Sequence, residues 1–295
     1  MNDRICAIIV TRNRKDTLRE CLDALNAQLR KPDHIVVVDN ASTDGTSEML
    51  EDEFSEVELL RLSRNEGGAG GFYWGIRNGY EQDFDLLWIM DDDTIPKVDA
   101  LAELEYAHMA IREIVGLPLL LSSRVEWVDG TVHPMNFPTI NFADQDLLVK
   151  LVEIGYLPIR SASFVSLLLH RQAIDKYGLP VKDYFIWNDD VEYTARILRN
   201  ELGFLVPKSV VIHKTKEKYI PISVSSPERY YYEVRNKIWM LSRSNAWTRK
   251  EKIKYGIRMV FDIGKFLRNK KFSPKAIFHI VRGVKDGIFH TPASN

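Results

Sequence analysis

Residues 5–14, ICAIIVTRNR, decide the fold, because a continuous apolar run ends there in a polar cluster. Such a run is typical of a strand covered on both faces of a sheet. The pattern returns at residues 35–40, IVVVDN, and at residues 86–93, LLWIMDDD. Residues 16–29 between the first two runs have apolar side chains at helical spacing. Strands separated by helices predict an α/β fold with a parallel, doubly wound sheet.

Polar clusters follow each expected strand of this first third. They occupy residues 11–14, 39–40, 65–71 and 91–93. In doubly wound sheets, ligands bind at the carboxyl ends of the strands. Because all four clusters fall at such ends, the sequence predicts one binding site along this edge.

The remaining elements are predicted from periodicity with less regular spacing. Helices are expected over residues 100–114, 190–200, 228–242, 249–268 and 276–289, and strands over 57–62, 117–122, 164–169, 204–206 and 210–212. Residues 126–145 are expected to form a long loop or hairpin. In the last two helices, apolar residues line one face and most basic residues lie on the others.

Composition and charge exclude several classes of protein. The 295 residues carry a net charge of -1 and include two cysteines, Cys6 and Cys21. This count excludes a disulfide scaffold, and both thiols are expected to be buried in a protein of a reducing compartment. No apolar run is long enough to span a membrane, and no secretory signal is expected before the first strand.

The near-zero net charge conceals two oppositely charged regions. Residues 1–228 contain 24 basic and 37 acidic side chains, whereas residues 229–295 contain 16 and 4. The acidic part suits a metal or nucleotide site. The basic part suits an anionic surface or partner.

Three adjacent carboxylates, Asp91, Asp92 and Asp93, directly follow a buried strand. Residues i and i+2 of an extended segment point the same way, so Asp91 and Asp93 can share one ion. Oxygen ligands favour a hard divalent ion such as Mg²⁺ or Mn²⁺. The alternative is an acidic turn and helix cap before Pro96.

The glycine-rich stretch 67–71, GGAGG, opens a helix and can approach a phosphate closely. It differs from the GxGxxG pattern and follows the third strand, which disfavours a dinucleotide-binding fold. A plain flexible loop is the alternative.

Two further polar positions have both a functional and a structural interpretation. Asp189 and Asp190 start a helix, so one can be a cap while the other is a general base. His213 ends a short strand and is either structural or the group that completes the ion shell of Asp91 and Asp93.

Taken in order, these motifs resemble the GT-A glycosyltransferases of family 2. The order is IIVTRNR, VVVDNASTDGT, DDD, WNDDVEY and then a histidine. Residues 65–72 (NEGGAGGF), 185–193 (FIWNDDVEY) and 230–236 (YYYEVRN) are similar to a bacterial subgroup of galactofuranosyl- and rhamnosyltransferases. The resemblance is dense over residues 4–95 and 160–240.

The resemblance implies a role for each matching residue. The nucleoside pocket is expected to contain Thr11, Arg12, Asp39 and Asn40, and the donor to be bordered by Asn65, Gly67, Gly68, Gly70 and Gly71. Asn40 departs from the wider family, in which two acidic residues are common here. Asp91, Asp93 and His213 are expected to bind the metal, and Asp92 to contact the donor ribose or sugar. Asp190 is the expected catalytic base, with Trp187 and Asp189 shaping the acceptor site.

The resemblance also implies a domain division and an activity. Residues 1–228 are expected to form a GT-A catalytic domain, with 1–95 as its nucleotide-binding half and 96–228 as its acceptor half. Residues 229–295 form a basic helical region. The expected reaction is inverting transfer, dependent on Mn²⁺ or Mg²⁺, from UDP-galactofuranose to a glycan or lipid-linked acceptor in cell-surface polysaccharide synthesis. The closest alternative donor is dTDP-rhamnose.

Other functions and partners stay open at this point. A nucleotidyltransferase also uses paired aspartates, but it would need a basic residue in an early glycine loop, and none is evident. A glycan- or sugar-nucleotide-binding module without turnover is a further alternative; nucleic acid is not an expected partner. The basic helices either bind an anionic membrane surface or pack on the catalytic domain or a second subunit, and these roles can coexist. The expected location is the cytoplasm, including the inner face of the cell membrane.

Overall fold

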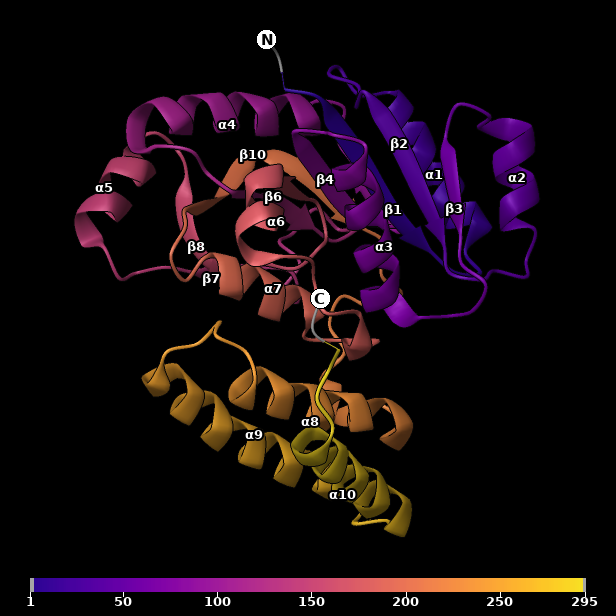
Figure 1. The fold of residues 1–295 in the computed structure, drawn as a ribbon, viewed down its shortest axis with the longest axis vertical. Coiled ribbons are helices and arrows are strands. Elements are labelled where there is room, and N and C mark those ends of the chain that lie inside the picture. The colour runs from indigo at the N-terminus through magenta and orange to yellow at the C-terminus, as the bar shows by residue number, and fades with distance from the viewer. Residues whose placement is uncertain (1–2, 294–295) are drawn as a thin grey trace.

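The computed structural model describes residues 3–293, which contain a ten-stranded sheet in the order β3-β2-β1-β4-β9-β6-β10-β8-β7, with β5 paired to β10 (Figure 1). The strands are β1 (Ile5–Thr11), β2 (His34–Asp39), β3 (Glu58–Arg61), β4 (Leu86–Asp91), β5 (Thr94–Pro96), β6 (Leu120–Glu126), β7 (Thr139–Ile140), β8 (Leu157–Ser161), β9 (Leu167–His170) and β10 (Gly203–His213).

Helices cover the sheet and form the C-terminal part of the chain. They are α1 (Lys15–Asn26), α2 (Thr46–Glu53), α3 (Gly67–Glu81), α4 (Ala100–Val115), α5 (Gln145–Glu153), α6 (Arg171–Tyr177), α7 (Asp189–Ile197), α8 (Pro227–Ser242), α9 (Arg249–Asn269) and α10 (Pro274–Phe289). Short 3-10 helices lie at Lys182–Tyr184 and Ile222–Val224.

The first half of the sheet confirms the predicted parallel arrangement. Strands β3, β2, β1 and β4 are neighbours, and all their pairings are parallel. The second half is mixed, because β9 lies between β4 and β6 and is antiparallel to both. The sheet is therefore mostly parallel only around the predicted nucleotide-binding half.

Continuous burial along β1 shows that both faces of the sheet are covered. Its odd-numbered apolar residues pack in one hydrophobic cluster with residues of α1, α2 and α4. Its even-numbered residues pack in a second cluster with residues of α3, α6 and α7. Cys6 and Cys21 lie in these clusters as buried free thiols, as predicted.

Three expected elements differ from the prediction. Residues 204–206 and 210–212 belong to one strand, β10, whose register shifts between Val206 and Val210. This shift explains why periodicity divided the strand. The expected long loop at residues 126–145 contains β7, and the unpredicted elements α5 and β8 follow it. Only two residues form β7, too few for a period-2 pattern to be recognised.

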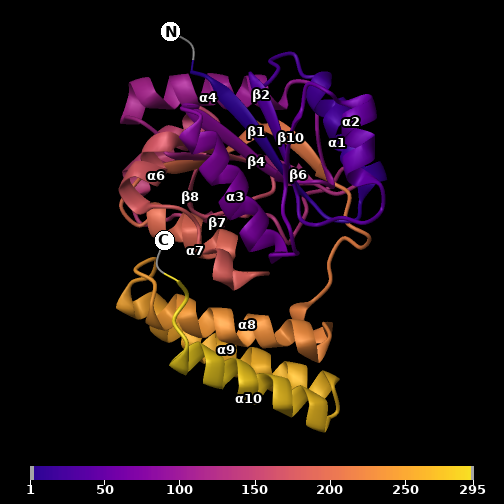
Figure 2. The same ribbon diagram turned by 45° about the vertical axis from the view of Figure 1, so that its right-hand side comes forward.

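Helices α8, α9 and α10 form a layer beneath the α/β body, and both views show this arrangement (Figure 1, Figure 2). They share a hydrophobic cluster of their own that includes Tyr230, Val234, Phe266 and Ile280. The Tyr230 and Phe266 rings stack with centroids 3.6 Å apart. The division of the chain at residue 228 stays a prediction.

Most of the apolar face predicted for residues 249–268 is exposed, although Leu267 near its C-terminal end packs in the cluster of α8, α9 and α10. Ile253, Ile257, Val260 and Phe261 are all exposed, Phe261 by 73%. Helix α9 instead packs through Phe266 and its partly buried neighbours. Among the described helices, none combines the length and apolar character needed to cross a membrane.

Candidate active site

Strand register brings the predicted site residues to one edge of the sheet. Thr11 at the end of β1 lies opposite Asp39 at the end of β2, and the neighbouring Val10 lies opposite Asp91 on β4. From the other half of the sheet, β10 runs antiparallel to β5 and places His213 opposite Thr94. This pairing brings the side chain of His213 against that of Asp93, 120 residues away in the chain.

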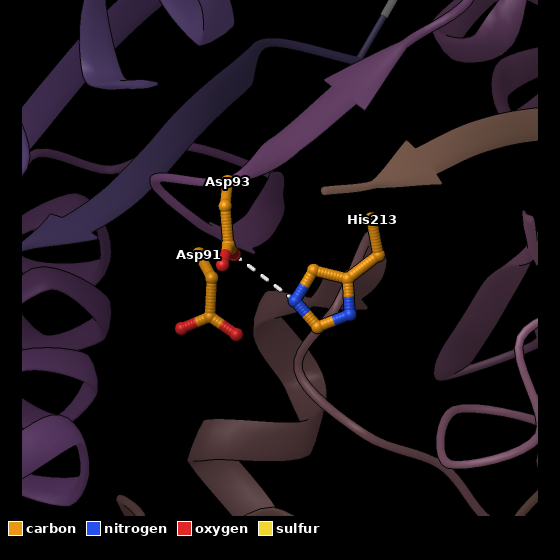
Figure 3. Close-up of side chains that lie close together, drawn as sticks. All are labelled: Asp91, Asp93 and His213. Carbon is orange, nitrogen blue, oxygen red and sulfur yellow. Dashed lines mark hydrogen bonds and ion pairs between the residues drawn. The ribbon is translucent and has the colours of Figure 1, made fainter. Parts of the chain in front are cut away.

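Asp91, Asp93 and His213 form a compact cluster (Figure 3). Each offers one ligand atom, and these atoms all lie within 4.8 Å of one another. His213 Nε2 lies 3.0 Å from Asp93 Oδ1. Two carboxylates and an imidazole at this spacing can bind a divalent cation.

The members of this cluster ionise differently because their neighbours differ. Burial, followed by the charge of Asp93, raises the pKa of Asp91 to about 7, and the charge of Asp190 contributes to this rise. Burial opposes ionisation of Asp93 as well, but His213 and Arg14 outweigh it and lower its pKa to about 2. Burial disfavours the charged form of His213, yet Asp93 raises its pKa. Several carboxylates thus share few positive charges, which favours binding of a cation.

His213 is oriented by a residue that the sequence analysis missed. Its Nδ1 lies 2.9 Å from Asn136 Oδ1, and the Asn136 amide donates to Ser163 Oγ at 3.1 Å. Because the amide nitrogen of Asn136 is used by Ser163, its oxygen faces the ring and accepts from Nδ1. Nε2 is then directed at the carboxylates, so the donor set fits a metal ion. Asn136 lies in the expected loop, where no periodic signal marks it.

Arg14 is a second residue that was not assigned to the site, although it ends the IIVTRNR motif. Its Nη1 lies 2.5 Å from Asp93 Oδ2 and 3.3 Å from Asp92 Oδ1. Asp92 also accepts a hydrogen bond from Thr11 Oγ1 at 2.7 Å. Burial raises the pKa of Asp92 to about 6 despite Arg14. The half-exposed guanidinium of Arg14 therefore partly neutralises the cluster from the solvent side.

The residues expected in the nucleoside pocket have different environments. Asp39 is fully buried and accepts hydrogen bonds from Ser42 N and Ser47 Oγ. Asn40 accepts from Glu66 N at 2.8 Å and donates to the Gly67 carbonyl at 2.7 Å. The Asn40 amide is thus occupied in holding the start of α3. Arg12 is exposed beside them.

The glycine-rich stretch is the first turn of α3 rather than a flexible loop. A Cβ at Gly67, whose φ is +74°, would lie 1.9 Å from the Phe185 carbonyl oxygen. A Cβ at Gly71 would lie 2.4 Å from the Val10 side chain, and one at Gly70 would also collide with a side chain. Of the four glycines predicted to border the donor, only Gly68 has open space where a Cβ would lie. Close packing therefore explains why glycine occupies the other three positions. Asn65 accepts a hydrogen bond from Gly67 N at 2.9 Å.

The loop over residues 185–188 leads into α7 with an unusual backbone. Phe185, Trp187 and Asn188 have φ values of 64°, 65° and 66°. Each such left-handed residue other than glycine costs about 1–3 kcal/mol. Asn188 is the residue that precedes α7, so neither Asp189 nor Asp190 occupies the N-cap position, and the expectation that one of them caps this helix is wrong. Asp189 is instead the first helical residue.

Burial opposes ionisation of both aspartates that begin α7. Burial raises the pKa of Asp190 to about 6, although its Oδ1 accepts from Val191 N at 2.7 Å. Burial, followed by the charge of Asp190, raises the pKa of Asp189 well above its usual value. Trp187 lies just before them, with the Arg229 guanidinium 4.9 Å from its ring centre.

Comparisons with known proteins agree with this fold. Residues 6–146 match the model of glycosyl transferase family 2. Galactofuranosyltransferase GlfT1 of Mycolicibacterium smegmatis is 28% identical over 213 residues, 68% of this chain and 67% of that protein. The dTDP-rhamnosyl transferase RfbF of Shigella flexneri is 26% identical over 257 residues, which are 83% of this chain and 82% of that protein.

Solved structures share the fold at lower identity. TarS of Staphylococcus aureus, residues 1–349 in complex with UDP-GlcNAc, has a TM-score of 0.64 at 15% identity and covers 98% of this chain and 82% of its own. This chain covers 43% of a longer TarS chain. The mannosyltransferase PcManGT of Pyrobaculum calidifontis, in complex with GDP-Man and Mn²⁺, has a TM-score of 0.56 at 13% identity, with 98% and 88% of the chains covered.

The mixed sheet, parallel around β1 and covered by helices on both faces, is the GT-A fold that the solved glycosyltransferase structures share. Within it, residues 6–146 match the family 2 glycosyltransferase model, and the chain is similar to galactofuranosyl- and rhamnosyltransferases. The nucleotidyltransferase hypothesis and the hypothesis of a module without turnover receive no support from these relatives.

Proposed function

We propose that the protein transfers galactofuranose from UDP-galactofuranose to a glycan or lipid-linked acceptor in cell-surface polysaccharide synthesis, with inversion and with Mn²⁺ or Mg²⁺ as cofactor. The juxtaposition of the Asp91–Asp93–His213 cluster with Asp190 carries this proposal. The GlfT1 relative supports the choice of donor.

In the proposed reaction, Asp190 accepts the proton of an acceptor hydroxyl. The hydroxyl oxygen attacks the anomeric carbon from the face opposite the leaving nucleotide, so a single displacement inverts that carbon. No carboxylate nucleophile is needed, in contrast to a retaining double displacement. Asp91, Asp93 and His213 would hold the cation, and its charge, when bound, stabilises the diphosphate that leaves. We propose that Thr11, Arg12, Asp39, Asn65 and Gly68 border the donor and that Trp187 and Asp189 border the acceptor.

A donor panel tests this assignment. In the presence of Mn²⁺, UDP-galactofuranose at about 100 times its dissociation constant is expected to raise the free energy of unfolding by about 2.7 kcal/mol. Thermal unfolding with UDP-galactofuranose, dTDP-rhamnose, UDP-GlcNAc and GDP-mannose measures the effect. Stabilisation by dTDP-rhamnose alone would contradict the proposed donor.

Rhamnose transfer from dTDP-rhamnose is the second candidate function. The RfbF relative favours it, because that match covers 83% of this chain against 68% for GlfT1. The same panel decides between the two donors, since the nucleotide as well as the sugar differs.

We also propose that the exposed apolar face of α9 binds an anionic membrane surface. Val260 and Phe261 are 70% and 73% exposed, and the surrounding region is strongly basic. Apolar side chains beside lysines and arginines are typical of helices that lie on anionic lipid.

Replacing both residues, Val260→Ser with Phe261→Ser, is expected to weaken binding to phosphatidylglycerol-rich vesicles at least tenfold, because the buried apolar area is lost. Vesicle sedimentation measures this, with Val128→Ser, exposed in the α/β part, as the control. Unchanged vesicle binding would refute the membrane role. Conversion of a dimer to a monomer by the same substitutions, without vesicle binding by the wild type, would assign the face to a second subunit.

A further inference from the structure

Helix α8 carries the motif YYYEVRN, residues 230–236, whose function the proposed reaction does not explain. Its Asn236 is fully buried, yet it lies beside the loop that precedes Asp190. The Asn236 amide nitrogen lies 2.9, 2.8 and 2.9 Å from the carbonyl oxygens of Tyr184, Ile186 and Trp187, so its two hydrogens are shared among three acceptors. The Asn236 side chain thus binds three of the four backbone carbonyl groups of residues 184–187.

The orientation of this amide is determined by Arg235. Arg235 Nε and Nη2 lie 3.0 and 2.9 Å from Asn236 Oδ1. Because a guanidinium only donates, the oxygen of Asn236 must face Arg235 and its NH₂ group must face the loop. Arg235 also donates directly to the carbonyls of Asp183 and Tyr184 at 2.6 and 3.0 Å.

A second contact from α8 holds the end of the same loop. Asn188, the left-handed residue before α7, donates to Glu233 Oε2 at 2.8 Å. Glu233 is buried and paired with Lys237, whose Nζ lies 2.6 Å from Oε1. Helix α8 therefore binds the loop at each residue with a positive φ or at its neighbours. It contacts Trp187 and Asn188 directly, and it binds the carbonyls on both sides of Phe185.

The opposite side of the loop contacts the predicted donor site. The Phe185 carbonyl, which α8 does not bind, accepts a hydrogen bond from Ala69 N at 3.2 Å in the first turn of α3. The close approach of Gly67 to the same carbonyl makes this junction tight. The loop is thus held between the start of α3 and helix α8.

We infer that Asn236, supported by Arg235 and Glu233, is a positioning residue that fixes the strained loop 184–188 and thereby the location of Asp190 and Trp187. Positive φ values at bulky residues persist only where surrounding contacts over-determine them. This inference rests on the proposed role of Asp190. It makes α8 part of the catalytic architecture, in addition to any function of the basic helices that follow.

Asn236→Asp tests the inference with little change in shape. Aspartate keeps an oxygen for Arg235 but places a second oxygen against three carbonyl oxygens. We expect backbone amide exchange over residues 182–190 to accelerate at least tenfold. The turnover number for sugar transfer should fall 10- to 100-fold, because small displacements of a catalytic group are costly. Affinity for UDP with Mn²⁺ should stay within twofold of the wild type.

Val234→Ala is the matched control, because Val234 is buried in the same helix but packs against α10. It is expected to lower the melting temperature without accelerating exchange in the loop. Asn188→Gly gives a second variant that tolerates the left-handed backbone while removing the contact with Glu233. It should accelerate exchange in the same segment.

Wild-type exchange over residues 182–190 in both Asn236→Asp and Asn188→Gly would overturn the inference. So would faster exchange in Asn236→Asp with an unchanged turnover number, or a loss of turnover that Val234→Ala reproduces at equal stability. If the wild type transferred no sugar from any donor, the proposed function would fail. Amide exchange would then decide whether Asn236 holds the loop.

Discussion

Asp190→Asn is expected to lower the rate of sugar transfer by about 10²- to 10⁴-fold, the usual contribution of a general base. The amide keeps the size of the side chain and can still accept from Val191 N, but it cannot take the acceptor proton. Stabilisation by UDP with Mn²⁺ should persist, because Asp190 is not among the predicted donor ligands. Initial rates and thermal unfolding on the same samples measure both effects.

The pH dependence gives a second measurement on this residue. The pKa of Asp190 is raised to about 6, and only its ionised form can accept a proton. The rate of transfer in the wild type should therefore fall as pH drops through about 6 and level off above it. Asp190→Asn should lack this step. A near-normal rate in Asp190→Asn would place the base elsewhere, with Asp189 as the next candidate.

Asp93→Ala is expected to abolish the Mn²⁺-dependent part of UDP binding and to lower transfer by about 10³-fold or more, or about 4 kcal/mol. The variant loses one of two carboxylates that the proposed cation would bridge, together with the partner of His213. Thermal unfolding with UDP, with and without Mn²⁺, reports the loss independently of turnover.

The fold of this variant should survive, because removing Asp93 also relieves its repulsion of Asp91. Glu51→Ala is the control for one lost negative charge, since Glu51 is exposed on α2, away from the cluster. Glu51→Ala should keep both UDP binding and transfer. Equal Mn²⁺-dependent stabilisation in Asp93→Ala and the wild type would refute the metal assignment.

The parallel half of the fold could be predicted because its signals are local. Apolar runs at β1, β2 and β4 are continuous, and each ends in polar residues, so strand identity and the binding edge followed from the pattern. The second half could not be predicted equally well. The antiparallel placement of β9 between β4 and β6 depends on pairings between distant segments, which periodicity does not encode.

The candidate site likewise contains residues that the sequence predicted and contacts that only the structure revealed. Asp91, Asp93 and Asp190 stand beside recognisable strand and helix boundaries, so their chemistry could be proposed from the chain alone. The proximity of His213 to Asp93 depended on the pairing of β10 with β5. Arg14 and Asn136 were missed, because each acts through a contact with a residue more than seventy positions away.

The sequence by itself determined the order of strands and helices around β1, the acidic edge of the sheet and the basic character of the C-terminal helices. Those properties depend on residue type and short-range spacing. Only the tertiary structure decided that α9 leaves its apolar face exposed and that Asn236 binds the loop before Asp190. A buried amide selects its partners from whatever backbone the completed fold brings within about 3 Å, and no local pattern specifies that choice.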